Sequence, residues 1–177
     1  MYYYYIYNFP IGKLTVASNE ENIVGLWLDG QKYYMDIFKG KEYQEKETET
    51  IKLAKKWLDK YFGKGKPEIS ELPIELIGSD FRKQIWKILS EIPYGKVITY
   101  RDIAKQIAEQ KGIKTMSAQA VGGAVGHNPI SVIIPCHRVV GTNGSLTGYA
   151  GGIKNKIKLL ELEGVDILRL YNKKPSA

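Results

Sequence analysis

Two periods of hydrophobic residues organise the first half of the chain. Aromatic and β-branched residues fill three short runs, and the turn residues at 10–12 and Asp29-Gly30 separate or end them. We therefore expect an antiparallel meander of strands over residues 1–9, 14–17 and 23–28. A 3.6-residue spacing then predicts one amphipathic helix from Thr48 to Phe62, with Gly63 as its stop. Its apolar face comprises Ile51, Ala54, Trp57, Leu58, Tyr61 and Phe62.

A domain boundary is expected near Gly78. The alternation of Leu72, Ile74 and Leu76 indicates a last strand before it. We therefore divide the chain into residues 1–78, an N-terminal domain of sheet plus helix, and residues 79–177.

Three helices are predicted after this boundary. Ser79 or Asp80 caps the first, whose apolar stripe is Phe81, Ile85, Ile88, Leu89 and Ile92. Thr99 stands three residues before Asp102, the spacing of a capping box, and starts the second. Ser117 caps the third, a run of small residues that ends at Asn128-Pro129. Two helices, a turn and a further helix are typical of a helix-turn-helix.

The remaining segments complete the expected fold. Residues 130–134 form an apolar run that predicts a buried strand, and residues 142–144 predict a hairpin turn. Residues 148–152 form a flexible loop able to wall a pocket, before a helix that Gly164 ends. The predicted fold class is α+β: a small antiparallel-sheet N-terminal domain and a helical, winged-helix-like helix-turn-helix C-terminal domain.

Composition excludes several classes of protein. The 177 residues are 44% hydrophobic and 25% charged, and no apolar run approaches the roughly 20 residues that span a bilayer. The first residues lack the pattern of a secretory signal, so we expect a cytoplasmic protein with no membrane partner. One cysteine and two histidines exclude an intrachain disulfide and a Cys-rich zinc site, so we expect no metal.

Positive charge is concentrated in the second half of the chain. Through Gly78 there are 11 basic and 12 acidic residues, whereas the remainder holds 15 basic and 7 acidic residues, a net charge of +8. A neutral module joined to a basic one favours a polyanionic partner such as nucleic acid. The alternative is a basic surface that only confers solubility.

The third helix has an unusual composition. Gly122 and Gly123 each cost about 1 kcal/mol of helix propensity relative to alanine. A helix without bulk either lies deep in a groove or packs tightly against a neighbouring element. Gln119 is almost the only side chain on it that can read base edges, so sequence-specific regulation is disfavoured.

The candidate chemistry centres on Cys136. Pro135 fixes the backbone before it, and His137 and Arg138 follow it. A free thiol is only about 3% thiolate at pH 7, and a nearby imidazole and basic residues are expected to lower its pKa. Glu163 is a candidate to orient the imidazole, as in nucleophile-base-acid triads. The alternatives are a cysteine that only packs in the core and a solvated helix-end glutamate.

These motifs together resemble the O6-alkylguanine-DNA alkyltransferase family, also called methylated-DNA–protein-cysteine methyltransferase. The match covers residues 81–166 closely and the first half only in the order of its elements. It includes Pro-Cys-His-Arg-Val at 135–139, Ala-Val-Gly-Gly-Ala at 120–124, Asn-Pro at 128–129, Gly-Tyr-Ala-Gly-Gly at 148–152, Ile-Pro-Tyr-Gly-Lys-Val at 92–97 and Thr99-Tyr100.

The resemblance implies DNA repair. A damaged guanine is flipped out of double-stranded DNA, and Cys136 takes its O6-alkyl group irreversibly, once per chain. His137 is then the base acting through a water, Glu163 its orienter, Asn128 a brace, and Tyr100 the group that protonates or hydrogen-bonds the leaving guanine. Tyr149 lines the base pocket, and main-chain groups near Val139 and Ala150 read the base. Further positions that contact substrate or DNA are Thr99, Ser117, Gln119, Ala120, Gly122, Gly123, Arg138 and Lys156. We expect no cofactor and a monomer.

Two departures and two rival functions accompany this resemblance. Many family members have an arginine where this chain has Gln119, which lacks the planar charge that stacks and attracts phosphates. Some members carry zinc in the first domain, for which this chain has no ligand set. The rivals are a Cys-His hydrolase and a non-enzymatic helix-turn-helix regulator or lesion sensor. Acceptance of O4-alkylthymine is left open.

Overall fold

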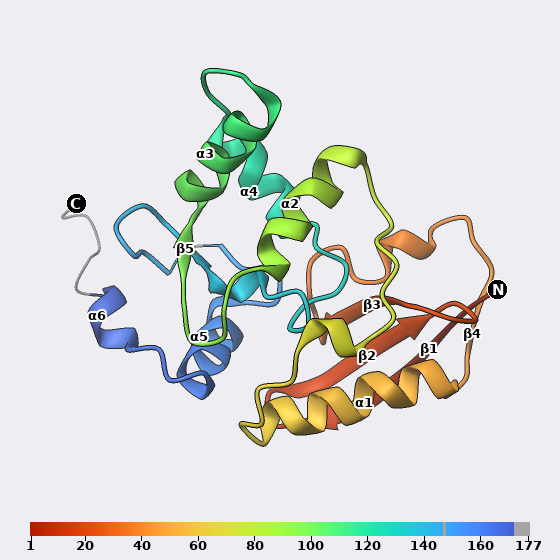
Figure 1. Ribbon diagram of the computed structural model, residues 1–177. Coiled ribbons are helices and arrows are strands. Elements are labelled where there is room, and N and C mark those ends of the chain that lie inside the picture. Colours follow the sequence, from red (N-terminus) through yellow and green to blue (C-terminus); the bar gives the residue numbers. More distant parts are fainter. Residues whose placement is uncertain (147, 172–177) are drawn as a thin grey trace.

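The computed structural model describes residues 1–146 and 148–171. Its first half is a four-stranded sheet (Figure 1), in which β1 (Tyr2–Phe9), β2 (Gly12–Ser18) and β3 (Ile23–Leu28) form the predicted antiparallel meander. A short strand that the sequence did not indicate, β4 (Tyr43–Glu45), pairs parallel to β1, giving the order β3-β2-β1-β4. The sheet is therefore antiparallel except at one edge.

The helix α1 (Glu49–Phe62) packs along the sheet, as Figure 1 shows. Thr48 caps it, because its hydroxyl accepts a hydrogen bond from the backbone N–H of Ile51 at 3.1 Å. Ile51, Ala54 and Leu58 are fully buried against the strands. The predicted helix and its apolar face are thus confirmed.

The predicted strand over Leu72, Ile74 and Leu76 is wrong. Residue 74 makes only an isolated parallel bridge to Ile23, and a short 3₁₀ turn, η2 (Ile69–Glu71), precedes it. Pro73 has no N–H to extend a ladder, although its carbonyl accepts from Ile23 at 2.7 Å. A second 3₁₀ turn, η1 (Asp36–Phe38), lies between β3 and β4.

The second half begins with the three predicted helices, α2 (Asp80–Ser90), α3 (Tyr100–Lys111) and α4 (Ala118–Gly126), which pack against one another. Ser79, Thr99 and Ser117 cap them through their hydroxyls, and Thr99 forms the capping box with Asp102. All three caps were predicted. The α3–α4 pair projects from the top of the molecule in Figure 1.

The rest of the second half is built around short elements. β5 (Ile98–Thr99) pairs parallel with β6 (Val139–Val140), and η3 (Cys136–Arg138) leads into β6. α5 (Ile153–Leu162) and α6 (Ile167–Tyr171) follow. The predicted turn at 142–144 exists, since Gly144 N–H donates to the Gly141 carbonyl, but no antiparallel pair of strands flanks it among the described residues. The α+β fold class is confirmed.

The predicted strand at 130–134 is also wrong, although the segment is buried as expected. Only Ile130 bridges to Leu26, and the Ile134 N–H donates back to the Ile130 carbonyl at 3.0 Å. Val132 adopts φ 69°, a left-handed conformation that a β-branched residue rarely takes. The apolar run is therefore a buried turn that delivers Cys136.

One apolar core joins the two halves. It includes Ile23, Leu26 and Leu58 from the first half and Ile85 and Val121 from the second. The boundary after Gly78 stays a prediction, and residues 172–177 of the predicted 79–177 domain lie outside the described residues.

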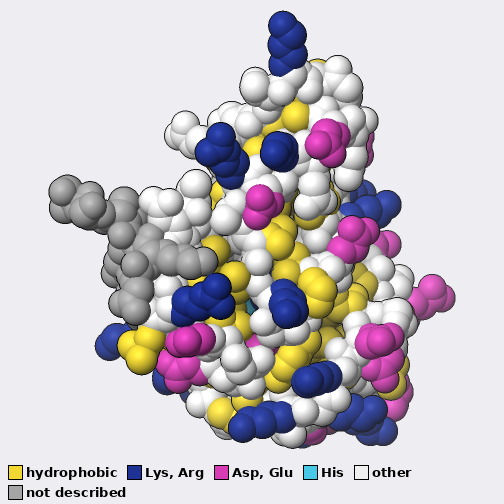
Figure 2. All heavy atoms as spheres, turned by 60° about the vertical axis from the view of Figure 1, so that its left-hand side comes forward, with side chains coloured by type: hydrophobic (Ala, Val, Ile, Leu, Met, Phe, Trp, Pro, Cys, Tyr) yellow, Lys and Arg dark blue, Asp and Glu magenta, His cyan; other side chains and the backbone are white. Residues whose placement is uncertain are grey.

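Charged side chains are dispersed on one face of the second half. Figure 2 shows Lys and Arg side chains spread between Asp and Glu, with a basic side chain at the tip of the upper lobe, where Figure 1 places the α3–α4 turn. Exposed basic residues of α3, this turn and α5 are Arg101, Lys105, Lys111, Lys114, Lys154 and Lys158. Within the described part of the chain, no helix is both long and apolar enough to traverse a bilayer.

Candidate active site

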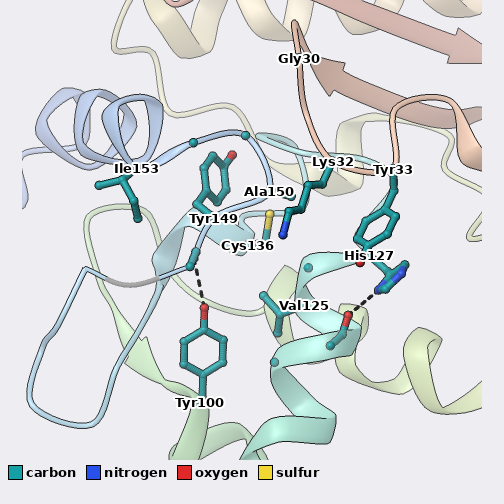
Figure 3. A pocket seen from close by; sticks show the side chains of 16 residues that line it. Gly30, Lys32, Tyr33, Tyr100, Val125, His127, Cys136, Tyr149, Ala150 and Ile153 are labelled. Atoms are coloured by element: carbon teal, nitrogen blue, oxygen red, sulfur yellow. Dashed lines mark hydrogen bonds between the residues drawn. The ribbon is translucent and has the colours of Figure 1, made fainter.

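Cys136 lies in the wall of a pocket of about 580 Å³. Figure 3 shows that the pocket is formed by segments far apart in the chain: the loop after β3, helices α3 and α4, and the 148–152 loop. Gly122 and Gly123 line it, so their lack of side chains leaves room beside the sulfur. The volume falls in the range of small-molecule sites.

Asn128 ties together the turn that carries the cysteine. Its Nδ2 donates to the Ile134 carbonyl at 2.8 Å, and its Oδ1 accepts from the Ile130 N–H at 3.0 Å. The side chain is 2% exposed, so water does not compete for these bonds. This is the geometry of the brace that the resemblance implied.

Burial raises the pKa of the Cys136 thiol. Hydrogen bonding from Asn128, the charge of Lys156 and hydrogen bonding from Ser131 act in the opposite direction but do not outweigh it. The expectation that neighbours lower this pKa below the ordinary value is therefore wrong. At rest the sulfur holds its proton, and a base must remove it.

Glu163 is the centre of a buried polar network behind the cysteine. Its Oε2 accepts from His137 Nε2 at 2.6 Å and from the Tyr61 hydroxyl, and its Oε1 accepts from Arg138 Nε at 2.7 Å and the Gly95 N–H at 3.0 Å. The Glu163 side chain is fully buried. The alternative of a solvated helix-end glutamate is thereby excluded.

The imidazole of His137 is held with one nitrogen free. It is 0% exposed, and its Nδ1 has no hydrogen-bond partner among the described residues. Burial lowers the pKa of His137, against the opposing effect of the bond to Glu163. Burial alone would raise the pKa of Glu163, but bonds from His137 and Arg138 hold it far below its usual range. The pair is thus a neutral imidazole beside a carboxylate.

Arg138 and Lys156 lie inside the protein, where they do not meet DNA in this conformation. Arg138 is 8% exposed and bonds to Glu163 and to the Ile92 carbonyl. Lys156 is 0% exposed and donates to the carbonyls of Val139 and Gly148. Burial lowers the pKa of Lys156 to about 8. These two predicted contact residues hold the walls of the site.

The two tyrosines of the predicted site are placed differently. The Tyr100 hydroxyl donates to the Gly148 carbonyl at 3.3 Å at the pocket edge, and burial raises its pKa to about 12. Tyr149 lines the pocket, and its buried hydroxyl has no hydrogen-bond partner among the described residues. Ala150 also lines the pocket, whereas the carbonyl of Val139 is already engaged by Lys156.

The predicted positions on α4 remain accessible. Ser117, Gln119, Ala120 and Gly123 are exposed, and Gly122 is half-buried. Thr99 is half-buried, and its hydroxyl accepts from the Asp102 N–H at 3.0 Å. The structure therefore presents one face of α4 beside the mouth of the cysteine pocket.

Sequence reasoning missed several site residues from the first half. Tyr61 reaches Glu163, and Gln31, Lys32 and Tyr33 belong to the loop after β3. The Lys32 N–H donates to the Ala150 carbonyl at 3.1 Å, and the Tyr33 ring stacks on His127 at 3.8 Å between centroids. In the sequence, Asp29-Gly30 predicted only a turn, so no local pattern indicated that the loop after β3 lines the pocket. Over residues 1–146 and 148–171, no cluster of three or more His, Cys, Asp or Glu side chains suits a metal ion.

Two family models match the chain. The 6-O-methylguanine DNA methyltransferase ribonuclease-like domain matches residues 2–76, and the DNA binding domain of the same family matches residues 80–165. The methylated-DNA–protein-cysteine methyltransferase of Methanosarcina acetivorans is 39% identical over 168 residues, covering 92% of this chain and 98% of the relative. That of Mycobacterium tuberculosis is 39% identical over 165 residues, covering 92% and 93%.

Solved structures agree with these relatives. The crystal structure of Mycobacterium tuberculosis OGT in complex with DNA superposes with a TM-score of 0.79 and 37% identity, covering 96% of this chain and 99% of that one. The O6-methylguanine-DNA methyltransferase of Pyrococcus kodakaraensis gives a TM-score of 0.67 and 26% identity, covering 93% and 100%. The chain therefore belongs to the methylated-DNA–protein-cysteine methyltransferase family.

Proposed function

We propose that this protein repairs DNA by moving the O6-alkyl group of an alkylated guanine onto Cys136. The substrate is a guanine flipped out of double-stranded DNA, and the protein acts once per chain, as a monomer in the cytoplasm. No cofactor takes part, because the accepting sulfur belongs to the protein.

The observation that carries this proposal is the position of Cys136. It lies between an open pocket and a buried histidine that can act as a general base. The sulfur lines the pocket, while His137 next to it is anchored to a fully buried carboxylate. A thiol that only packs in the core has neither feature. A nucleophile needs both, because its target must reach it and its proton must leave it.

The proton path follows from the free nitrogen of the imidazole. His137 Nε2 is engaged with Glu163, so Nδ1 is the acceptor for the thiol proton, directly or through one water. Glu163 then stabilises the imidazolium. The network holds this charge in place before any substrate arrives.

The transfer itself is a displacement at the alkyl carbon. The sulfur electron pair forms the S–C bond as the C–O6 bond breaks, and the electrons of that bond pass to the guanine. Tyr100, whose hydroxyl lies at the pocket edge, donates a hydrogen bond to the leaving base. The base gains one proton overall, equal to the one that the thiol lost.

DNA is bound through α4 and its neighbours. The exposed first turn of the helix, with Ser117, Gln119 and Ala120, offers few groups that discriminate bases. Recognition then depends on the DNA backbone and on the ease of extruding a damaged base, as repair at any sequence requires. Gln119 brings an uncharged side chain to this exposed turn.

The test is to mix the chain with a duplex that contains O6-methylguanine and to measure the mass of the intact protein. One methyl increment on Cys136, saturating at one per chain, is expected. Cys136→Ala should bind the same duplex with unchanged affinity and gain no mass. Repeated product release would instead indicate a hydrolase, and tight binding without a mass change would indicate a lesion sensor.

A further inference from the structure

Tyr61, near the end of α1, places a hydroxyl inside the charged network of the second half. The side chain is 1% exposed, and its ring stacks on Trp57 with the two ring planes 7° apart. Its hydroxyl contacts Oε2 of Glu163, which lies 102 residues away in the sequence. The first half of the chain therefore supplies a rigidly held polar group to the carboxylate behind the reaction centre.

The carboxylate of Glu163 is contacted by more donors than it can serve fully. Oε1 accepts from Arg138 Nε at 2.7 Å and from the Gly95 N–H at 3.0 Å. Oε2 is contacted by His137 Nε2 at 2.6 Å, by Arg138 Nη2 at 3.1 Å and by the Tyr61 hydroxyl. A carboxylate has about four lone-pair sites, shared equally between its oxygens. Tyr61 and His137 therefore share the charge of one crowded oxygen.

The direction of each bond follows from the chemistry of its atoms. Arg138, whose guanidinium is always charged, donates to both oxygens of Glu163, so the carboxyl group is ionised. His137 Nε2, 2.6 Å from this carboxylate, must then carry a proton and donate it. A protonated nitrogen cannot accept from the Tyr61 hydroxyl, which lies 3.5 Å away from it. The single proton of that hydroxyl is therefore directed at Oε2 of Glu163.

We propose that Tyr61 is a positioning residue for the base of the reaction: its hydroxyl occupies Oε2 of Glu163 and so limits how strongly that oxygen binds the N–H of His137. A weaker bond to the carboxylate keeps the imidazole from becoming an imidazolium before substrate arrives. The imidazole is then ready to accept a proton at Nδ1. The part that this proton transfer plays in repair rests on the proposed function, but the effect on the imidazole does not.

The other charged and titratable groups around the imidazole are common to all the variants below. They are Glu163 at the end of α5, Lys156 within α5, and Cys136 and Arg138 on either side of His137 in the chain. A change confined to position 61 leaves this set intact. Any change in the imidazole then reports the hydroxyl at position 61.

Two changes at position 61 should act in opposite directions. Tyr61→Phe keeps the ring but removes the hydroxyl, so the carboxylate binds the His137 N–H more strongly. The NMR signal of the Nε2 proton should then move downfield, and the pKa of His137 should rise by about half to one unit. Meta-fluorotyrosine at the same position is a more acidic phenol and a stronger donor. It should move both quantities in the opposite direction by a smaller amount.

The experiment records the imidazole proton and nitrogen NMR signals of the full chain between pH 5 and 8. The sequence has two histidines, and His127→Gln identifies the signals of His137 by elimination. The same position-61 variants are then tested for methyl transfer from O6-methylguanine in a duplex. The acid limb of the transfer rate should move to higher pH in Tyr61→Phe, by the same amount as the pKa of His137.

The two measurements separate this inference from the proposed function. The NMR signals need no DNA, so shifted signals in a chain that takes no methyl group would overturn only the proposed function. Unshifted signals in a chain that repairs DNA would overturn only this inference.

A matched control tests whether the position of the hydroxyl matters. Tyr94 packs against Tyr61, with the ring centroids 6.1 Å apart, but its hydroxyl donates to the Leu162 carbonyl at 3.2 Å. Tyr94→Phe therefore makes the same chemical change in the same surroundings without touching the carboxylate. It should leave the Nε2 proton signal of His137 in place. Equal shifts in Tyr94→Phe and Tyr61→Phe overturn the proposal.

The direction of the shifts separates the hydroxyl of Tyr61 from a general loosening of the network. Burial lowers the pKa of His137, so entry of water would also raise it. Water would, however, move the Nε2 proton upfield or remove its signal by exchange, and either result in Tyr61→Phe overturns the proposal. Should Tyr61→Phe fail to fold, the fluorinated ring, which retains the bond, decides the matter. Its Nε2 proton should move upfield while the pKa of His137 falls, and signals left in place overturn the proposal.

Discussion

The two sides of the Cys136–His137 pair are built in opposite ways. In front of the sulfur lies an open pocket lined by glycines and aromatic rings. Behind the imidazole, Glu163 accepts hydrogen bonds from Tyr61, Gly95, His137 and Arg138, with its side chain fully buried. The difference shows that the groups that manage charge are assembled in advance, whereas the space for the alkylated base is left empty of side chains.

The largest expected effect is on stability, from a change in the buried network around Glu163. Glu163→Gln leaves the guanidinium of Arg138 buried without its counter-charge, so the free energy of unfolding should fall by about 3–5 kcal/mol. Urea denaturation measures this. Glu161→Gln, at an exposed position of the same helix, should change it by less than about 0.5 kcal/mol. Equal losses in the two variants would mean that the network is not a special site of stability.

Lowering the pH should reduce the free energy of unfolding in two stages, one from His137 and one from Glu163. Burial lowers the pKa of His137 in the folded protein, so the unfolded chain gains the proton first as the pH falls below about 6.5. Stability should therefore drop by about 1 kcal/mol between pH 7 and 5.5. The pKa of Glu163 is also lowered, so its contribution is complete above about pH 4.3 and is lost only at lower pH.

Urea denaturation across this range separates the two stages. His137→Gln should remove the first and retain the second. A single loss confined to low pH in the unmodified chain would show that the imidazole is not held neutral by the fold.

The smallest effect comes from the side of the open pocket, where a substitution should stabilise the protein rather than destabilise it. A Cβ at Gly123 would meet no atom within 4 Å, so Gly123→Ala should raise the free energy of unfolding by up to about 1 kcal/mol through helix propensity. The added methyl group lies on an exposed position of α4 at the pocket, so affinity for the damaged duplex should fall a few-fold. Urea denaturation measures the change in stability, and a binding titration measures the change in affinity. A stabilised variant with full affinity would show that the absence of a side chain at Gly123 does not serve DNA binding.

Helices and their caps were predictable because their determinants are local. Ser79, Thr99 and Ser117 each cap the helix that follows within one turn. The two wrong strands failed for an equally local reason that hydrophobicity does not report. Pro73 interrupts one ladder, and the Asn128 amide and the φ of Val132 turn the other apolar run back on itself.

The reaction centre was only partly predictable. Cys136, His137 and Glu163 carry chemistry that a sequence displays, and the structure brings the histidine and the glutamate together. Tyr61 fits the apolar face of α1 by its spacing alone. The helical period therefore gave no sign that its hydroxyl bonds to the carboxylate of Glu163, 102 residues away. The net pKa of the thiol was misjudged because burial is a property of the whole fold.

The bond between Tyr61 and Glu163 has a consequence for protein engineering. A second half excised from the chain or grafted onto a foreign first half loses the hydroxyl of Tyr61 from Glu163 and the side-chain amide of Gln31 from Ser131. Chimeras should therefore be cut so that α1 and the loop after β3 travel with the cysteine, or the lost partners must be rebuilt on the new scaffold.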